Sequence, residues 1–66
     1  MKLIFENSKG EERVIAEPQN ETLAMKYIHQ FCEERNFKIY YIRSWTSNNR
    51  KVFDVGSHTE FFYLEE

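Results

Sequence analysis

The chain lacks the features that mark secreted and membrane-bound proteins. It has one cysteine in 66 residues, so no disulfide can form within it, and a lone thiol is typical of a reducing compartment. The start of the chain reaches Glu6 after only three consecutive apolar residues, and no apolar run approaches the about 20 residues that a membrane span needs. We therefore expect a cytoplasmic protein with no cleaved leader and no membrane partner.

Catalytic motifs are also missing. Asp54, Ser57 and His58 include the residue types of a hydrolase triad, but no nucleophile-elbow glycine pattern surrounds them. His58 and Glu60 match half of a zinc-deaminase signature whose cysteine half is absent. Asp54 or Ser57 is more simply explained as a cap for the backbone around Gly56. We expect no enzymatic activity and no cofactor.

One metal site remains a weaker alternative. His29 and Cys32 stand three residues apart on a predicted helix, where they share a face, and His58 is a conceivable third ligand. A metal needs three or four converging ligands, and the sequence does not show that these three meet. Cys32 lies on the apolar stripe of that helix, so we expect a buried, unreactive side chain.

The short chain predicts a single domain, residues 1–66, that is short of core. A domain of this length buries only about 60% of the surface that its unfolded chain exposes. Disulfides, metals and oligomerisation are the usual supplements. With one cysteine and no strong metal motif, oligomerisation is the supplement that we expect.

Hydrophobic periodicity predicts one helix and five strands. Asn20 is a good N-cap, Asn36 suits the left-handed position that ends a helix, and Pro18 ends the preceding strand. The predicted elements are strands at 2–6 and 12–17, a helix of about fifteen residues after Asn20, and strands at 37–45, 51–55 and 60–64. The fold class is therefore α+β, a small β-β-α-β-β-β domain with one helix packed on one face of an antiparallel sheet.

The strands carry more apolar side chains than one helix can cover. We expect the helix to cover Leu3, Phe5, Val14, Ala16, Ile39, Tyr41, Phe53, Val55, Phe62 and Leu64. The opposite face then holds Ile4, Ile15, Tyr40, Ile42, Val52, Phe61 and Tyr63. Seven apolar or aromatic side chains on one face of so small a domain predict an interface with a second copy or with a partner.

Charge is unevenly distributed. The segment 35–51 has five basic side chains and no acidic one, whereas the flanking segments have net charges of −3 and −4. Tyr40, Arg43 and Trp45 combine aromatic faces with a cation, as in open sheets that bind single-stranded nucleic acid. The preferred interpretation is that the basic segment pairs with acidic neighbours of the same chain, which leaves nucleic-acid binding as the alternative function.

The second half of the chain resembles a group of small uncharacterised proteins encoded by phages and prophages of Gram-positive bacteria. The resemblance rests on Asn36-Phe37-Lys38-Ile39-Tyr40-Tyr41-Ile42-Arg43-Ser44-Trp45 and on Asp54-Val55-Gly56-Ser57-His58-Thr59-Glu60-Phe61-Phe62. It carries over no functional residues. It implies a working place inside an infected host cell, where many small phage proteins act by binding a host enzyme or defence protein.

Together these observations predict a non-catalytic phage or prophage protein in the host cytoplasm. We expect it to form a homodimer and to bind a host protein of unknown identity, with counter-defence inhibition as the most concrete version. The expected partner-binding residues, on an exposed aromatic sheet face, are Tyr40, Ile42, Arg43, Trp45, Phe61 and Tyr63.

Overall fold

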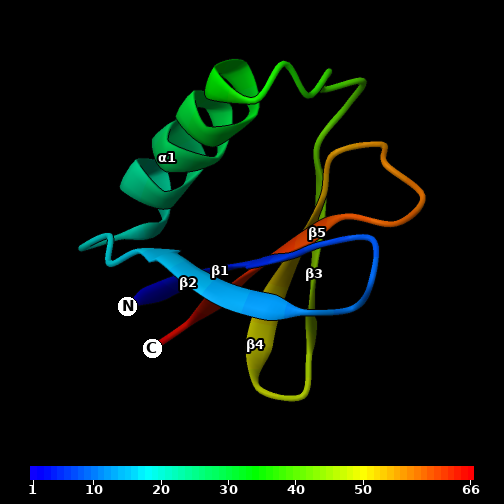
Figure 1. The fold of residues 1–66 in the computed structure, drawn as a ribbon. Helices are drawn as coiled ribbons and strands as arrows, with labels where there is room; N and C mark the ends of the chain where they lie inside the picture. Colours follow the sequence, from blue (N-terminus) through cyan, green and yellow to red (C-terminus); the bar gives the residue numbers. More distant parts are fainter.

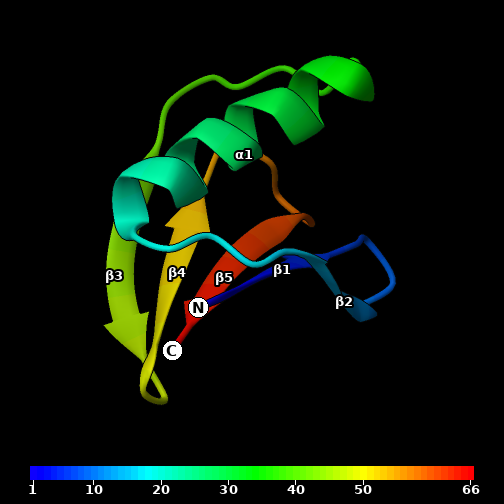
Figure 2. The ribbon, with the colours of Figure 1, turned by 90° about the vertical axis from the view of Figure 1, so that its left-hand side faces the viewer.

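The computed structural model describes all 66 residues as a five-stranded antiparallel sheet with one helix across one face (Figures 1 and 2). The elements are β1 (Lys2–Glu6), β2 (Glu12–Ala16), α1 (Glu21–Glu34), β3 (Arg43–Ser47), β4 (Arg50–Asp54) and β5 (Phe61–Glu65). In the sheet they lie in the order β2-β1-β5-β4-β3, so the C-terminal strand occupies the centre between two hairpins. The predicted fold class and element order are confirmed.

Side-chain and backbone caps fix both ends of α1 where the sequence predicted them. The side-chain oxygen of Asn20 accepts a hydrogen bond from the N–H of Leu23 at 2.9 Å. At the other end Asn36 has a φ of 57°, and the N–H of Phe37 donates to the carbonyl oxygen of Cys32 at 2.8 Å. This is a Schellman motif, which ends the helix and turns Phe37 back toward the core.

The core lies between α1 and the inner face of the sheet. Its ten buried members are Leu3, Phe5, Ala24, Ile28, Phe31, Cys32, Phe53, Val55, Phe62 and Leu64. Cys32 is buried as predicted, and burial raises the pKa of its thiol. No helix of this chain combines the length and the apolar character required to cross a membrane.

The predicted third strand is wrong over most of its length. The segment 37–42 is an irregular connection, and β3 begins only at Arg43. The reason is topological, since α1 is followed in the sheet by an edge strand and the chain must first travel to that edge (Figure 2). The apolar residues between 37 and 42, which the prediction divided between two faces of a strand, therefore belong to a crossover. In it Ile39 and Ile42 contact the core, and Tyr40 and Tyr41 are exposed.

A bulge in β2 overturns two of the face assignments. Leu3 pairs with Ala16, but the next residue, Ile4, pairs with Val14, so Ile15 is an extra residue in the ladder. Ile15 consequently packs against the core, and Val14 is exposed. Periodicity could not reveal this, because one inserted residue reverses the alternation of every residue beyond it.

Candidate binding site

A groove of about 980 Å³ lies between the connection from α1 to β3 and the connection from β4 to β5. In Figure 1 these are the green segment that descends to β3 and the orange loop beside it. Its lining is Asn36, Phe37, Lys38, Tyr40, Tyr41, Val55, Gly56, Ser57, His58, Thr59, Glu60 and Phe62. Both stretches on which the phage-protein resemblance rests contribute to it. We call this surface the aromatic groove.

Phe37 anchors one side of the aromatic groove to the core. Its ring centroid lies 6.1 Å from that of Phe5 and 6.4 Å from that of Phe31. These are ordinary spacings for interacting aromatic pairs. Phe37 remains partly exposed, so one part of the ring contacts the core while another lines the groove.

Gly56 fixes the position of Tyr40. Its φ of +94° lies in a region that side chains rarely adopt, and a Cβ at this position would be 2.8 Å from the Cβ of Tyr40. The N–H of Tyr40 also donates to the carbonyl oxygen of Val55 at 3.1 Å. The two connections thus touch backbone to backbone, yet the Tyr40 residue is still 67% exposed.

Asp54 ties the start of β3 to the turn at Gly56. One carboxylate oxygen accepts from Arg43 Nη2 at 2.8 Å, and the other accepts from the N–H of Gly56 at 2.9 Å. The hydrogen bond from Arg43, followed by that from Gly56, holds the pKa of Asp54 below its usual value. The guanidinium carbon of Arg43 lies 5.2 Å from the centre of the Tyr41 ring, within range of a cation–π contact. The predicted capping role of Asp54 is confirmed.

The lowered pKa of Asp54 predicts a loss of stability in acid. A carboxylate whose folded pKa is depressed stabilises the fold above its unfolded pKa, here near 3.8, and loses that contribution as the pH falls through the folded value. We expect Asp54→Asn to lower the free energy of unfolding by about 1–2 kcal/mol at pH 7. In urea titrations at several pH values, the difference between the two proteins should shrink as the pH falls below 3.8 and through the folded pKa of Asp54. A deficit that is equal at all pH values would contradict the ion pair.

The stretch from Ser57 to Glu60 is a turn that satisfies its own polar groups. The hydroxyls of Ser57 and Thr59 each donate to the Glu60 carboxylate at 2.6 Å, and the N–H of Glu60 donates back to the Ser57 oxygen at 3.1 Å. These hydroxyls lower the pKa of Glu60, the larger effect coming from Ser57. No hydrogen bond joins His58 to Ser57 or Asp54. The arrangement orders a loop and does not assemble a triad.

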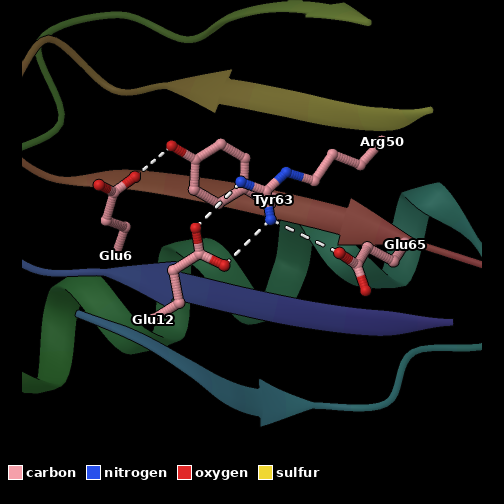
Figure 3. A network of polar contacts seen from close by, with 5 residues as sticks. All are labelled: Glu6, Glu12, Arg50, Tyr63 and Glu65. Carbon is pink, nitrogen blue, oxygen red and sulfur yellow. Dashed lines mark hydrogen bonds and ion pairs between the residues drawn. The ribbon is translucent and has the colours of Figure 1, made fainter. Parts of the chain in front are cut away.

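Polar side chains cover the sheet face opposite α1. Arg50 on β4 donates two hydrogen bonds of 3.0 Å, from Nη1 and Nη2, to the carboxylate of Glu12 on β2 (Figure 3). Its Nη1 also lies 3.5 Å from a carboxylate oxygen of Glu65, and its guanidinium carbon lies 3.7 Å from the centre of the Tyr63 ring. Beneath this layer Ile4 is 6% exposed and Val52 is 5% exposed. We use the name Arg50 network for five side chains on this face: Glu6, Glu12, Arg50, Tyr63 and Glu65.

Tyr63 is the central ring of the Arg50 network. Its hydroxyl donates to the Glu6 carboxylate (Figure 3). Burial and, secondarily, this hydrogen bond raise the pKa of Tyr63 to about 12. The phenol therefore stays protonated at neutral pH and remains a donor. The hydrogen bond from Arg50 lowers the pKa of Glu12, so the Glu12 carboxylate stays charged at neutral pH and remains paired with Arg50.

The predicted bare apolar face is therefore wrong. Of the seven side chains assigned to it, Ile4 and Val52 are buried and Tyr40 is exposed. The other four are half-buried: Ile15, Ile42, Phe61 and Tyr63. Ile15 and Ile42 contact the core on the side of the helix. Ile4 and Val52 pair in the sheet with Tyr63, whose ring lies under the Arg50 guanidinium, a form of cover that apolar periodicity does not reveal.

The six predicted partner-binding residues do not form one surface. Trp45, Phe61 and Tyr63 line a shallow hollow of about 260 Å³ on the sheet face opposite α1. Tyr40 lines the aromatic groove, Arg43 pairs with Asp54, and Ile42 contacts the core. The prediction omitted Phe37, Tyr41 and Gly56. Gly56 was recognisable from sequence as a turn, but its contact with Tyr40 joins residues sixteen positions apart.

Most of the basic segment is neutralised within the chain, as the preferred interpretation predicted. Three of its five cations form ion pairs: Arg43 with Asp54, Arg50 with Glu12 and Glu65, and Lys51 with Glu21. The other two lie over aromatic rings, Arg35 over Phe31 at 3.9 Å and Lys38 over Tyr40 at 4.9 Å. The cation–π contacts do not neutralise Arg35 and Lys38, so two uncompensated cations of the segment remain for contact with a phosphate backbone.

The three proposed metal ligands are not brought together. No group of three or more histidine, cysteine, aspartate or glutamate side chains is placed to hold a metal ion. Cys32 faces the core, whereas His29 and His58 are exposed. The alternative of a site built from these residues has no support in the geometry.

Comparisons with protein-family models, with curated proteins and with solved structures found no match.

Proposed function

We propose that this chain is a non-catalytic binding domain that engages a host protein through the aromatic groove. The observation that carries the proposal is the fixed, exposed pair Tyr40 and Tyr41, held over Gly56 beside Phe37. The resemblance to phage and prophage proteins supplies the setting, the cytoplasm of a Gram-positive host. Counter-defence inhibition is the most specific form of the proposal.

The physical basis is the low cost of ordering these side chains on binding. Tyrosine and arginine are enriched among the residues that dominate interface energies. A tyrosine has only two side-chain torsions, and Tyr40 is already restrained by its backbone contact with Val55 and Gly56. A partner that covers the groove would therefore gain apolar contact area with little loss of conformational entropy.

The polar groups around the groove support a binding role over a catalytic one. Both oxygens of Asp54 accept hydrogen bonds, and both oxygens of Glu60 accept from hydroxyls of its own turn. The Glu60 carboxylate that accepts from the Ser57 hydroxyl has a lowered pKa and is therefore a weak base, and the Ser57 oxygen already accepts from the N–H of Glu60. Asp54, Ser57 and Glu60 already have structural partners, and His58 hydrogen-bonds to none of them.

Site-specific photo-crosslinking in the host cell tests the proposal. A benzophenone amino acid in place of Tyr40 should give an adduct with one host protein, while the same group in place of Lys26, which is exposed on α1, should not. Tyr41→Ala in the Tyr40-labelled chain should reduce the adduct by about tenfold or more, as expected for a central interface aromatic.

Two results would reject a protein partner for the groove. One is an identical set of adducts from positions 40 and 26, which would indicate collisions without a binding surface. The other is an adduct that nuclease removes and protease does not, together with salt-sensitive binding of oligonucleotides. That second result would favour the alternative, single-stranded nucleic-acid binding.

A further inference from the structure

The β3 strand is an edge that no other part of the chain covers. All five of its residues, Arg43 to Ser47, are exposed. The other edge, β2, carries three features that discourage pairing: charges at Glu12 and Arg13, the bulge at Ile15, and Pro18 just beyond its end. Between Ser44 and Ser47 the β3 edge has no charge, proline or bulge.

The backbone groups that β3 presents outward follow from its turn. Asn48 and Asn49 both have positive φ, 52° and 63°, which defines a two-residue hairpin loop of the I′ type. Such a turn is closed by a hydrogen-bonded pair, here Ser47 and Arg50. Because hydrogen-bonded and open pairs alternate along an antiparallel ladder, the N–H and C=O groups of Ser44 and Thr46 point away from β4.

We propose that β3 pairs with β3 of a second copy, antiparallel and centred on Trp45, so that two sheets join into one of ten strands. In this register Ser44 faces the partner's Thr46 and Thr46 faces the partner's Ser44, which uses all four outward groups on each chain. Trp45 then lies opposite the partner's Trp45 as an open pair, the arrangement in which facing side chains approach most closely.

The strand is complementary to itself in this register. Arg43, its only charged residue, falls opposite the partner's Ser47, so no like charges meet. The cation of Arg43 is in any case held by Asp54 at 2.8 Å. Ser44 and Thr46 carry hydroxyls that can hydrogen-bond to one another across the pair. Trp45 is 44% exposed in the single chain and gains the most cover.

An edge-to-edge dimer also agrees better with the sheet than a face-to-face dimer. The face opposite α1 is covered by the Arg50 network, and a partner stacked on it would have to displace or desolvate those charges. Pairing at β3 leaves the network and the aromatic groove untouched. The contact is small, so association should be weak and visible only at high micromolar concentration.

Sedimentation equilibrium of the full chain, from low micromolar to millimolar concentration, tests the proposal. The 8.1 kDa chain should approach twice that mass, and the emission of Trp45, the only tryptophan, should shift to the blue over the same range. Thr46→Pro removes an outward N–H without touching the ladder with β4, and it should weaken association about thirty-fold by deleting two hydrogen bonds per dimer. Thr46→Val keeps the N–H and loses only the hydroxyl, so it should weaken association far less than Thr46→Pro does.

A second variant makes the result independent of how proline is tolerated. Trp45→Glu places like charges opposite each other at the centre of the pairing and should leave a monomer with an unchanged circular dichroism spectrum. A chain that stays monomeric at millimolar concentration would overturn the proposal, as would equal dimerisation of the Thr46→Pro variant and the wild type. Blue-shifted Trp45 emission produced only by a foreign protein would assign the edge to that protein and would overturn self-pairing.

Discussion

Replacing Gly56 by alanine is expected to destabilise the domain by about 3 kcal/mol or more. Two effects add at this position, a left-handed backbone at φ +94° and a Cβ that would lie 2.8 Å from the Cβ of Tyr40. Neither atom of that contact is the end of a flexible side chain, so one connection must move away from the other. For a domain of 60–100 residues such a loss lowers the midpoint of thermal unfolding by about 12–24 °C.

Gly10→Ala is a matched control for this prediction. Gly10 also has a positive φ, +80°, but the nearest atom to an added Cβ is a carboxylate oxygen of Glu6 at 3.8 Å. It should therefore show the backbone effect alone, about 1–2 kcal/mol. Urea titration of both variants isolates the steric contribution of Tyr40. Equal losses would contradict the close approach of the two connections.

The same pair of variants bears on the aromatic groove. If Gly56 positions Tyr40 for binding, Gly56→Ala should lower partner crosslinking from position 40 at temperatures where the variant is still folded. Gly10→Ala should leave the crosslinking unchanged, because the turn after β1 does not line the groove. A binding defect separated from unfolding in this way would link the glycine turn to the proposed function.

Local sequence signals predicted the elements whose causes are local. Asn20 and Asn36 mark the ends of α1 because each satisfies backbone groups within five residues of itself. The capping role of Asp54 was predictable for the same reason, since its acceptor serves Gly56 two residues away. The first strand, Lys2–Glu6, was predicted with its bounds because its short apolar run lies between charged residues and is followed directly by a turn.

The misassigned features depend on contacts between distant residues. The crossover before β3 reads as a strand until the sheet order places β3 at an edge beyond β4. The bulge at Ile15 exists only in the register with β1. Arg50 and Glu12 are 38 positions apart, so their pairing leaves no local pattern. Apolar counting therefore overestimated the exposed face, because it treated long charged side chains as solvent-facing only.

The Arg50 network predicts a second large effect. Arg50→Ala should lower the free energy of unfolding by about 2–3 kcal/mol, since it removes the paired hydrogen bonds to Glu12, the contact with the Tyr63 ring and the cover over Ile4 and Val52. Part of the ion pair is exposed to solvent, so it contributes the smaller share. Binding of a hydrophobic dye should rise with the newly exposed apolar surface.

Two further variants distinguish cover from charge. Arg50→Lys keeps the charge but loses the planar fork and its stacking on Tyr63, so it should recover less than half of the lost stability. Lys51→Ala removes the adjacent cation and its ion pair with Glu21 and should cost at most about 1 kcal/mol. If Arg50→Ala and Lys51→Ala are equally mild and neither binds dye, the network does not shield the sheet. The sheet face opposite α1 would then be stable without shielding by Arg50, and self-association through that face would regain its physical basis.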